Sequence, residues 1–259
     1  MSRGDRELFR WRREPFAPPL ILGHRGVRGT LPENTMLAFE RARQEGADGI
    51  ELDVRTTADG VVIVAHDRDL ARMTAGRDVR LVEAIRASEL PSIALEGGGV
   101  APTLAEVLDW ADAHRLRVNV ELKHDVPDRL RLARAVSRLL SSRARASRRV
   151  LVSSFDPLLV AAMASLSPSV PRALLVHARQ RYARSRAAGV AARLLSSIAI
   201  HMERTLCSPS RVARLRAQGL LVNVWTVNDP REARDLARLG VDALITDDPA
   251  GIIAALAER

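Results

Sequence analysis

The sequence predicts a single (β/α)8 TIM barrel, and three observations lead to this fold class. The chain of 259 residues has the length that one such barrel occupies. Strand-like runs rich in β-branched residues alternate with helix-like segments along almost the whole chain. Eight strand–helix units can be counted, and parallel strands joined by helices over this length favour a closed barrel. A doubly wound open sheet is the alternative, but no G-x-G-x-x-G motif follows the first strand-like run.

The expected elements begin with a strand over residues 20–23 and a helix over 33–45, which Gly46 ends. A strand over 49–54 precedes an extra short strand over 61–65. Thr103 and Glu106 form a capping box that starts the next helix. Further strands are expected at 117–122, 150–153, 172–176, 197–201, 221–226 and 243–246, and helices at 103–114, 127–142, 157–166, 180–195, 209–217, 230–239 and 249–256.

The chain is expected to form one barrel domain over residues 19–259, with an N-terminal arm over residues 1–18. Residues of about 67–102 are irregular and rich in glycine near 97–99, so they are interpreted as a small insertion after the second strand. The arm contains Phe9, Trp11 and Phe16 among arginines, which suggests weak contact with an anionic membrane surface. An arm packed across the end of the barrel or left mobile is the favoured alternative.

Composition points to a cytoplasmic protein that does not bind nucleic acid. Cys207 is the single cysteine, so no internal disulfide can form, and no apolar run has the length of a signal peptide core or a membrane span. The net charge of +9 comes from basic residues spread along the chain with few aromatic residues between them. The oligomeric state cannot be inferred from these features.

Lysine usage singles out one position. Of the 40 basic residues only Lys123 is a lysine, so arginine stands wherever any positive charge is sufficient. A compact ammonium group differs from a planar guanidinium in size and hydrogen-bond geometry. The sequence therefore suggests that position 123 requires an ammonium group, although survival of one codon by chance is the plain alternative.

Charged side chains near the ends of the expected strands indicate a metal site. Glu51 and Asp53 lie two residues apart on one strand, so their side chains share a face at a spacing of roughly 6.6 Å. Glu121 and Lys123 repeat this pattern on the next main strand, where Glu121 can supply a third oxygen and Lys123 can bind a phosphate oxygen. Oxygen ligands favour a divalent cation such as Mg²⁺ or Ca²⁺, or else Mn²⁺. A salt-bridge network without metal is the alternative.

His24 and His66 are the candidate proton carriers because each ends a strand beside these carboxylates, and imidazole titrates near neutral pH. Arg25 offers a planar fork that suits a phosphate group. Asn34 either belongs to the site or caps the following helix. The other histidines are expected on the surface or in packing roles. They are His114, His124, His177 and His201, of which the last ends an expected strand.

These residues resemble the glycerophosphodiester phosphodiesterase family over about residues 20–250. The match is weak between residues 129 and 218, where substrate choice is expected to reside. The motifs that carry the resemblance are HRG at 24–26, PENT at 32–35, AF at 38–39, GAD at 46–48, ELDV at 51–54, HD at 66–67, PTL at 102–104, NVELK at 119–123, SF at 154–155, VWTVN at 224–228, GVD at 240–242 and TDDP at 246–249.

The resemblance implies metal-dependent hydrolysis of a small phosphodiester to glycerol 3-phosphate and an alcohol, with an acid/base pair, three metal ligands and several substrate-binding residues. It implies that Glu33 orients the site and that Trp225 packs against the glycerol part of the substrate. The implied catalytic residues are His24 and His66, the metal ligands are Glu51, Asp53 and Glu121, and the substrate-binding residues are Arg25, Glu33, Asn34, Lys123 and Trp225.

Two other functions remain as alternatives at this point. A member of the same family could cleave lysophospholipids in the manner of a lysophospholipase D, which would need an apolar mouth facing the membrane. A barrel of this kind could also bind a phosphorylated ligand without turnover. The presence of both histidines and all three carboxylates argues against a protein without catalysis.

Overall fold

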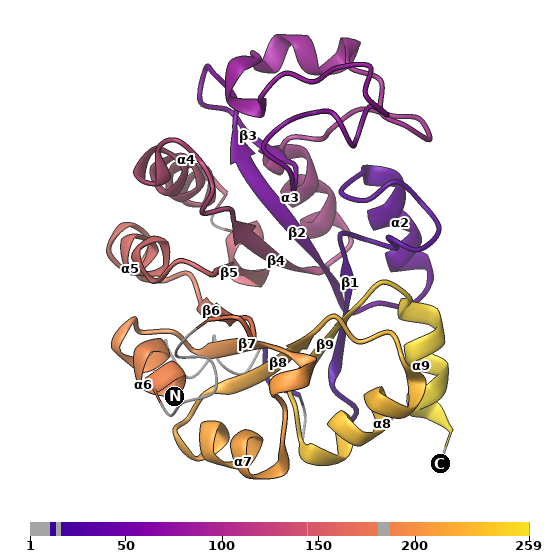
Figure 1. The fold of residues 1–259 in the computed structure, drawn as a ribbon, viewed down its shortest axis with the longest axis vertical. Helices are drawn as coiled ribbons and strands as arrows, with labels where there is room; N and C mark the ends of the chain where they lie inside the picture. Colours follow the sequence, from indigo (N-terminus) through magenta and orange to yellow (C-terminus); the bar gives the residue numbers. More distant parts are fainter. Residues whose placement is uncertain (1–10, 14–16, 144, 181–186, 259) are drawn as a thin grey trace.

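Eight parallel strands close into a barrel with helices on its outside (Figure 1). The computed structural model describes residues 11–13, 17–143, 145–180 and 187–258. The strand order is β1-β9-β8-β7-β6-β5-β4-β2, and pairing of β1 with β2 closes the ring. The strands are β1 (Leu20–His24), β2 (Gly49–Thr56), β4 (Arg117–Leu122), β5 (Val150–Ser154), β6 (Arg172–Val176), β7 (Ala199–Glu203), β8 (Leu221–Trp225) and β9 (Ala243–Thr246). The predicted (β/α)8 fold is confirmed.

Helices follow the strands in the order that the sequence predicts, and several begin with proline after an aspartate cap. Among the described residues, no helix has the length and the apolar character needed to cross a membrane. The helices are α2 (Met36–Gln44), α3 (Leu104–Ala113), α4 (Arg129–Ser142), α5 (Pro157–Leu166), α6 (Ala187–Leu194), α7 (Pro209–Ala217), α8 (Pro230–Leu239) and α9 (Pro249–Ala257).

The start of α2 differs from the expected one by three residues. Asn34 has φ of 59°, a left-handed conformation that stops the helix from including it. Thr35 is the N-cap, and its side-chain oxygen accepts a hydrogen bond from the backbone nitrogen of Ala38 at 3.2 Å. The alternative of Asn34 as the helix cap is therefore wrong, and its side chain is available to the site.

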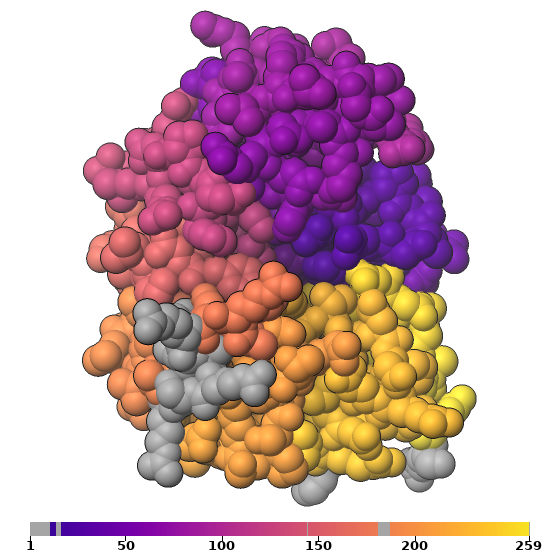
Figure 2. Space-filling view, viewed as in Figure 1, coloured from indigo at the N-terminus to yellow at the C-terminus, as the bar shows by residue number. Residues whose placement is uncertain are grey.

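Residues between β3 (Val62–Val64) and α3 form a lobe beside the barrel. Strand β3 pairs antiparallel with the end of β2, and two 3₁₀ helices, Val82–Ala84 and Ala87–Ser92, follow it. Figure 2 shows this segment gathered at one end of the molecule, next to the N-terminal part of the barrel. The lobe has its own small core, made of Ile63, Ala65, Leu70, Val82, Ile85, Leu90, Ile93 and Ala101.

Trp11 fills the end of the barrel at which the parallel strands begin. It is 0% exposed and packs among barrel residues that include Ala199 and Leu221, the first residues of β7 and β8. The buried position of Trp11 agrees with the favoured alternative of an arm packed across the end of the barrel, and contact of the arm with a membrane stays a prediction. Phe9 and Phe16 lie outside the described residues.

Candidate active site

The expected site residues meet at the carboxyl ends of three neighbouring strands. In the sheet register, His24 of β1 is opposite Glu51 of β2, and Asp53 of β2 is opposite Glu121 of β4. Parallel strands bring residues that are far apart in sequence to one edge of the barrel, where its active sites are found. The fold therefore brings these candidate residues to one place.

Three buried carboxylates form the centre of this site. One oxygen from each of Glu51, Asp53 and Glu121 lies within 4.8 Å of the others. Each side chain is buried, so water can screen their mutual repulsion only weakly. This spacing and the all-oxygen donor set suit a single divalent cation with metal–oxygen distances of about 2.0–2.6 Å.

The protonation of the three carboxylates differs according to their neighbours. Burial and the charge of Asp53 raise the pKa of Glu51 well above its ordinary value. Burial raises the pKa of Glu121 to about 7 despite the nearby Lys123. Burial also acts on Asp53, but Lys123 and Arg25 outweigh it and lower the pKa of Asp53. The site therefore has more negative groups than its own cations can neutralise, which is the condition that a bound cation would relieve.

Two cations and one amide hold Asp53 in position. The Nε of Arg25 lies 3.0 Å from Oδ2 of Asp53, and Nδ2 of Asn34 donates to the same oxygen at 3.1 Å. Lys123 Nζ lies 3.4 Å from Oδ1 of Asp53 and 3.0 Å from Oε1 of Glu121. Arg25 and Lys123 thus lie on different sides of the carboxylate cluster, where both can contact an anionic group.

His24 is held by a carboxylate on its Nδ1 side. Its Nδ1 lies 2.6 Å from Oδ1 of Asp247, and Asn228 donates to the other oxygen of Asp247 at 2.7 Å. Burial of Asp247 opposes ionisation, but its contacts with His24 and Asn228 together outweigh burial and lower the pKa of Asp247. The Nε2 of His24 lies 4.0 Å from Glu51, so this nitrogen is on the side of the carboxylate cluster.

His66 has a similar arrangement in which both partners come from the lobe. Its Nδ1 lies 2.6 Å from Oδ1 of Asp67, and Arg72 Nε lies 2.5 Å from the other oxygen of Asp67. Burial lowers the pKa of His66, although the charge of Asp53 acts in the opposite direction. Each of the two histidines therefore has one ring nitrogen fixed by an aspartate that is itself held by a second side chain.

Glu33 links the barrel to the lobe. Its carboxylate accepts hydrogen bonds from Arg25 at 2.9 Å, Arg28 at 2.8 Å and Arg72 at 2.7 Å. Burial would raise the pKa of Glu33, but Arg72 and Arg25 lower it, so the carboxylate stays ionised. Because Arg72 also contacts Asp67, the position of His66 is connected to the barrel through this network.

A pocket of about 220 Å³ lies directly over the carboxylates. Trp225 forms part of its wall, with its ring centroid 5.5 Å from that of Phe155 and 5.8 Å from that of His177. Its lining residues are His24, Arg25, Glu51, His66, Asn119, Glu121, Lys123, Phe155, Leu175, His177, Trp225 and Ile245. The pocket therefore joins a charged floor to an aromatic wall.

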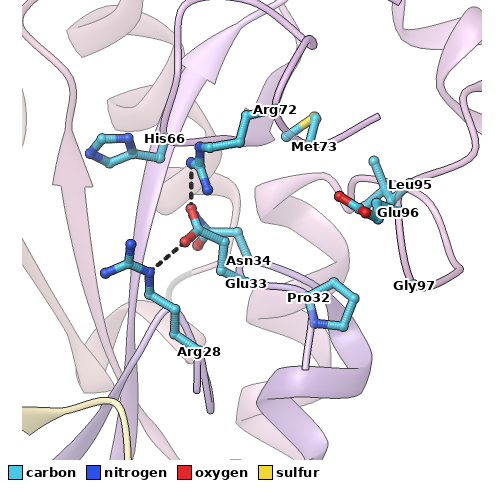
Figure 3. A pocket seen from close by; sticks show the side chains of 10 residues that line it. All are labelled: Arg28, Pro32, Glu33, Asn34, His66, Arg72, Met73, Leu95, Glu96 and Gly97. Atoms are coloured by element: carbon cyan, nitrogen blue, oxygen red, sulfur yellow. Dashed lines mark hydrogen bonds and ion pairs between the residues drawn. The ribbon is translucent and has the colours of Figure 1, made fainter. Parts of the chain in front are cut away.

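A second pocket of about 390 Å³ shares His66 with the first one. Figure 3 shows the side chains that line this second pocket. One side of it comes from the connection between β1 and α2, and the other side comes from the lobe. Its lining residues are Arg28, Pro32, Glu33, Asn34, His66, Arg72, Met73, Leu95, Glu96 and Gly97. A group bound beside His66 would therefore have the smaller pocket on one side and the larger pocket on the other.

Two histidines outside the predicted pair have distinct environments. His177 lines the smaller pocket, so its expected surface or packing role is incomplete. It follows β6 directly, and the rule that selected other residues at strand ends could have found it. His201 is buried inside the barrel, where it contacts Asn223 at 2.9 Å and burial lowers its pKa to about 3. His201 is therefore a neutral packing residue.

Four polar residues that hold the histidines were not predicted as site residues. They are Asp67, Arg72, Asn228 and Asp247, and all four lie within or beside motifs of the family resemblance. The signal that could have found Asp67, Asn228 and Asp247 is their place shortly after strand ends, whereas Arg72 lies farther along, in the lobe. The contact of Asp247 with His24 depends on the barrel closing, since these residues are 223 positions apart, whereas Asp67 is the sequence neighbour of His66.

Sequence and structure comparisons decide the family. The profile of the glycerophosphoryl diester phosphodiesterase family matches residues 24–251. The chain belongs to this family. It is 32% identical over 249 residues to a glycerophosphodiester phosphodiesterase of Bacillus altitudinis, with 88% of this chain and 94% of that protein covered. The chain is accordingly a phosphoric diester hydrolase.

Solved structures of glycerophosphodiester phosphodiesterases share the whole fold. An Oleispira antarctica phosphodiesterase in complex with the product sn-glycerol-3-phosphate has a TM-score of 0.82 and 26% identity, covering 93% of this chain and 98% of that one. The enzyme from Thermotoga maritima has a TM-score of 0.77 and 28% identity, covering 93% and 99% of the two chains.

Proposed function

We infer that this glycerophosphodiester phosphodiesterase hydrolyses water-soluble glycerophosphodiesters to glycerol 3-phosphate and an alcohol, with a divalent metal ion and two histidines. The observation that carries this proposal is the placement of His24 and His66 beside one buried cluster of three carboxylates. The product named in the Oleispira antarctica complex supports glycerol 3-phosphate as the product of this chain.

Glu51, Asp53 and Glu121 are the proposed ligands of Mg²⁺ or Ca²⁺. Their oxygens are close enough to share one ion, and burial together with the charge of Asp53 raises the pKa values of Glu51 and Glu121. When bound, such an ion would polarise the phosphoryl group and offset its developing charge. Hard oxygen ligands suit both ions, so the identity of the metal is left to measurement.

The remaining site residues bind the diester and transfer protons. Arg25 and Lys123 bind the phosphoryl oxygens and stabilise negative charge in the transition state. Trp225 and Phe155 pack against the glycerol part, in a pocket smaller than the roughly 300–1,000 Å³ that drug-sized ligands occupy. One histidine accepts a proton from the nucleophile that attacks phosphorus, and the other donates a proton to the oxygen of the departing alcohol. Asn34 and Glu33 hold Asp53 and Arg25 in place for these steps.

Product release from defined substrates tests this function. We expect release of glycerol 3-phosphate from glycerophosphocholine or glycerophosphoethanolamine with Mg²⁺ or Ca²⁺, and its loss with EDTA. His24→Ala purified in the same way controls for contaminating activity. Cleavage of a lysophospholipid alone would replace the proposal with a lysophospholipase D activity. Inactivity on all substrates with either metal would favour a barrel that binds phosphorylated ligands without turnover.

The pKa values of the metal-free site predict how metal binding depends on pH. Glu51 and Glu121 have raised pKa values in the folded protein, whereas unfolded glutamate titrates near about 4.3. Protonation of these two carboxyl groups contributes stability that is fully present below about pH 4.3. This stability is lost as the pH rises through the raised pKa values of the folded protein. A metal ion replaces these protons, so its binding strengthens over the same range. We therefore expect saturating Mg²⁺ or Ca²⁺ to raise Tm more at about pH 8 than at about pH 5.

Differential scanning calorimetry with and without each metal measures this difference. The control is Glu51→Gln, which removes one ionisable ligand and should reduce the dependence on pH. An equal increase in Tm at both pH values would show that the metal does not displace protons from these carboxylates.

The contact between Asp247 and His24 predicts a defect in turnover rather than in binding. Asp247→Asn keeps the shape of the side chain but removes the charge that fixes Nδ1 of His24. We expect kcat to fall by about 10- to 100-fold while KM changes little. Steady-state kinetics on glycerophosphocholine measure both constants, and Asp247→Glu should recover part of kcat. A change in KM alone would assign Asp247 to substrate binding.

A further inference from the structure

The larger pocket beside His66 has a charge pattern that singles out Glu96. Two arginines line this pocket, but Arg28 and Arg72 both bind Glu33, and Arg72 also binds Asp67. Within the part of the chain that the structure describes, no hydrogen bond or ion pair engages the side chain of Glu96. Glu96 is therefore the carboxylate of this pocket whose charge remains available to a ligand.

The position of Glu96 is fixed by the loop that carries it. Its backbone nitrogen donates to the carbonyl oxygen of Met73 at 2.8 Å, which ties the two walls of the lobe together. Gly97 has φ of +78°, and a Cβ atom there would lie 2.5 Å from Cγ of Pro32. Glycine thus lets the loop lie directly against the barrel, and Figure 3 shows Glu96 across the pocket from Arg72 and Glu33.

Apolar side chains line the same pocket as this exposed carboxylate. Pro32, Met73 and Leu95 contribute aliphatic and thioether surface to the same pocket. Ligand pockets of this kind use a few polar groups for orientation and apolar walls for contact area, and methionine adapts well to methyl groups. An exposed carboxylate without a protein partner among the described residues, beside these apolar side chains, suits a cation that carries alkyl substituents.

We propose that this pocket binds the head group of the departing alcohol, and that Glu96 favours diesters with an alkylammonium head group over diesters with a neutral one. The inference rests on the proposed hydrolysis of glycerophosphodiesters. His66 lines both pockets, so a phosphate bound there can direct its glycerol toward Trp225 and its other ester group toward Glu96. The lobe then selects the substrate while the barrel supplies the chemistry.

The test compares two diesters that differ in head-group charge, glycerophosphocholine and glycerophosphoglycerol. Glu96→Gln keeps the size of the side chain and removes its charge. We expect kcat/KM for glycerophosphocholine to fall about three- to fivefold through KM, as for an exposed ion pair, while the value for glycerophosphoglycerol stays unchanged. Glu96→Lys should extend the loss for the cationic substrate to about tenfold.

Asp235→Asn is the matched control, because this aspartate is exposed on α8 and its side chain contacts only Arg238 among the described residues. Its ratio of kcat/KM between the two diesters should equal that of the wild type. An unchanged ratio in both Glu96 variants would overturn the head-group assignment while the hydrolase function stands. A wild-type protein that cleaves neither diester would instead overturn the proposed function, and the assignment of the pocket with it.

Discussion

Glu51→Ala is expected to lower kcat/KM for glycerophosphodiesters by about 10³-fold, because one of three proposed metal ligands is lost. Glu51 is buried between Asp53 and Glu121, and its carboxylate also accepts a hydrogen bond from the backbone nitrogen of Arg25 at 3.2 Å. Two carboxylates cannot hold the ion as three do, so the phosphoryl group loses its strongest source of charge stabilisation. The measurement is kcat/KM at saturating Mg²⁺ and Ca²⁺, together with calorimetric titration of each ion.

The same substitution should leave the metal-free fold intact. Burial, together with the charges of Asp53 and Glu121, raises the pKa of Glu51 in that state, so removing this carboxyl group relieves an unfavourable environment. This gain opposes the loss of packing, and we expect Tm without metal to change by no more than about 4 °C. The increase in Tm on adding metal should disappear. Asp235→Ala, which removes an exposed carboxylate on α8, should keep both activity and this increase.

Wild-type activity of Glu51→Ala in EDTA would contradict the metal role directly. If Glu51→Ala unfolds, Asp53→Asn tests the role of the carboxylates as metal ligands instead. In Asp53→Asn the side chain keeps its size and can still accept hydrogen bonds from Asn34 and Arg25. For that variant we expect the same loss of calorimetric metal binding, so the two substitutions together separate a folding defect from a missing ligand.

The fold and the centre of the site could be predicted because both depend on short-range patterns. Eight strand–helix units are visible as alternating apolar runs, and the i, i+2 spacing of Glu51 with Asp53 sets their common face. The strand-end rule then brings His24 and Glu121 to the same edge. These steps need only the period of a strand and the parallel order of the barrel.

The support of His24 and the second pocket depend on contacts that local patterns do not specify. Asp247 reaches His24 only when β9 pairs with β1. The sequence placed substrate choice between residues 129 and 218, and Phe155, Leu175 and His177 from that region do line the smaller pocket. The larger pocket is instead lined by the lobe, whose irregular segment gives no strand or helix period from which its position could be inferred.

The distribution of arginines also differs between sequence and space. Arginines that look dispersed along the chain gather near the first residues of β4 and β5, where a pocket of about 400 Å³ is lined by Asp112, Arg115, Arg117, Arg145, Arg148 and Arg149. Dispersal along the chain therefore does not imply dispersal over the surface. The expectation that the protein binds no nucleic acid stays a prediction, since it relied on that dispersal.

Lys123→Arg is expected to reduce kcat/KM by about 100-fold although it preserves the charge. The lysine side chain is 8% exposed, and its Nζ lies 3.0 Å from Glu121 and 3.4 Å from Asp53. A guanidinium is longer and planar, so it cannot occupy the space of an ammonium group between these carboxylates. It would extend into the pocket of about 220 Å³, where the phosphoryl group is proposed to bind.

Kinetics of Lys123→Arg and Lys123→Met together separate shape from charge. The methionine variant removes the ammonium group and keeps an unbranched side chain, so it measures the loss of the charge itself. If the arginine variant is as defective as the methionine variant, the compact shape of the ammonium group is required at this position. Full activity of Lys123→Arg would show that any positive charge is sufficient, and the single lysine among 40 basic residues would then be a coincidence of codon usage.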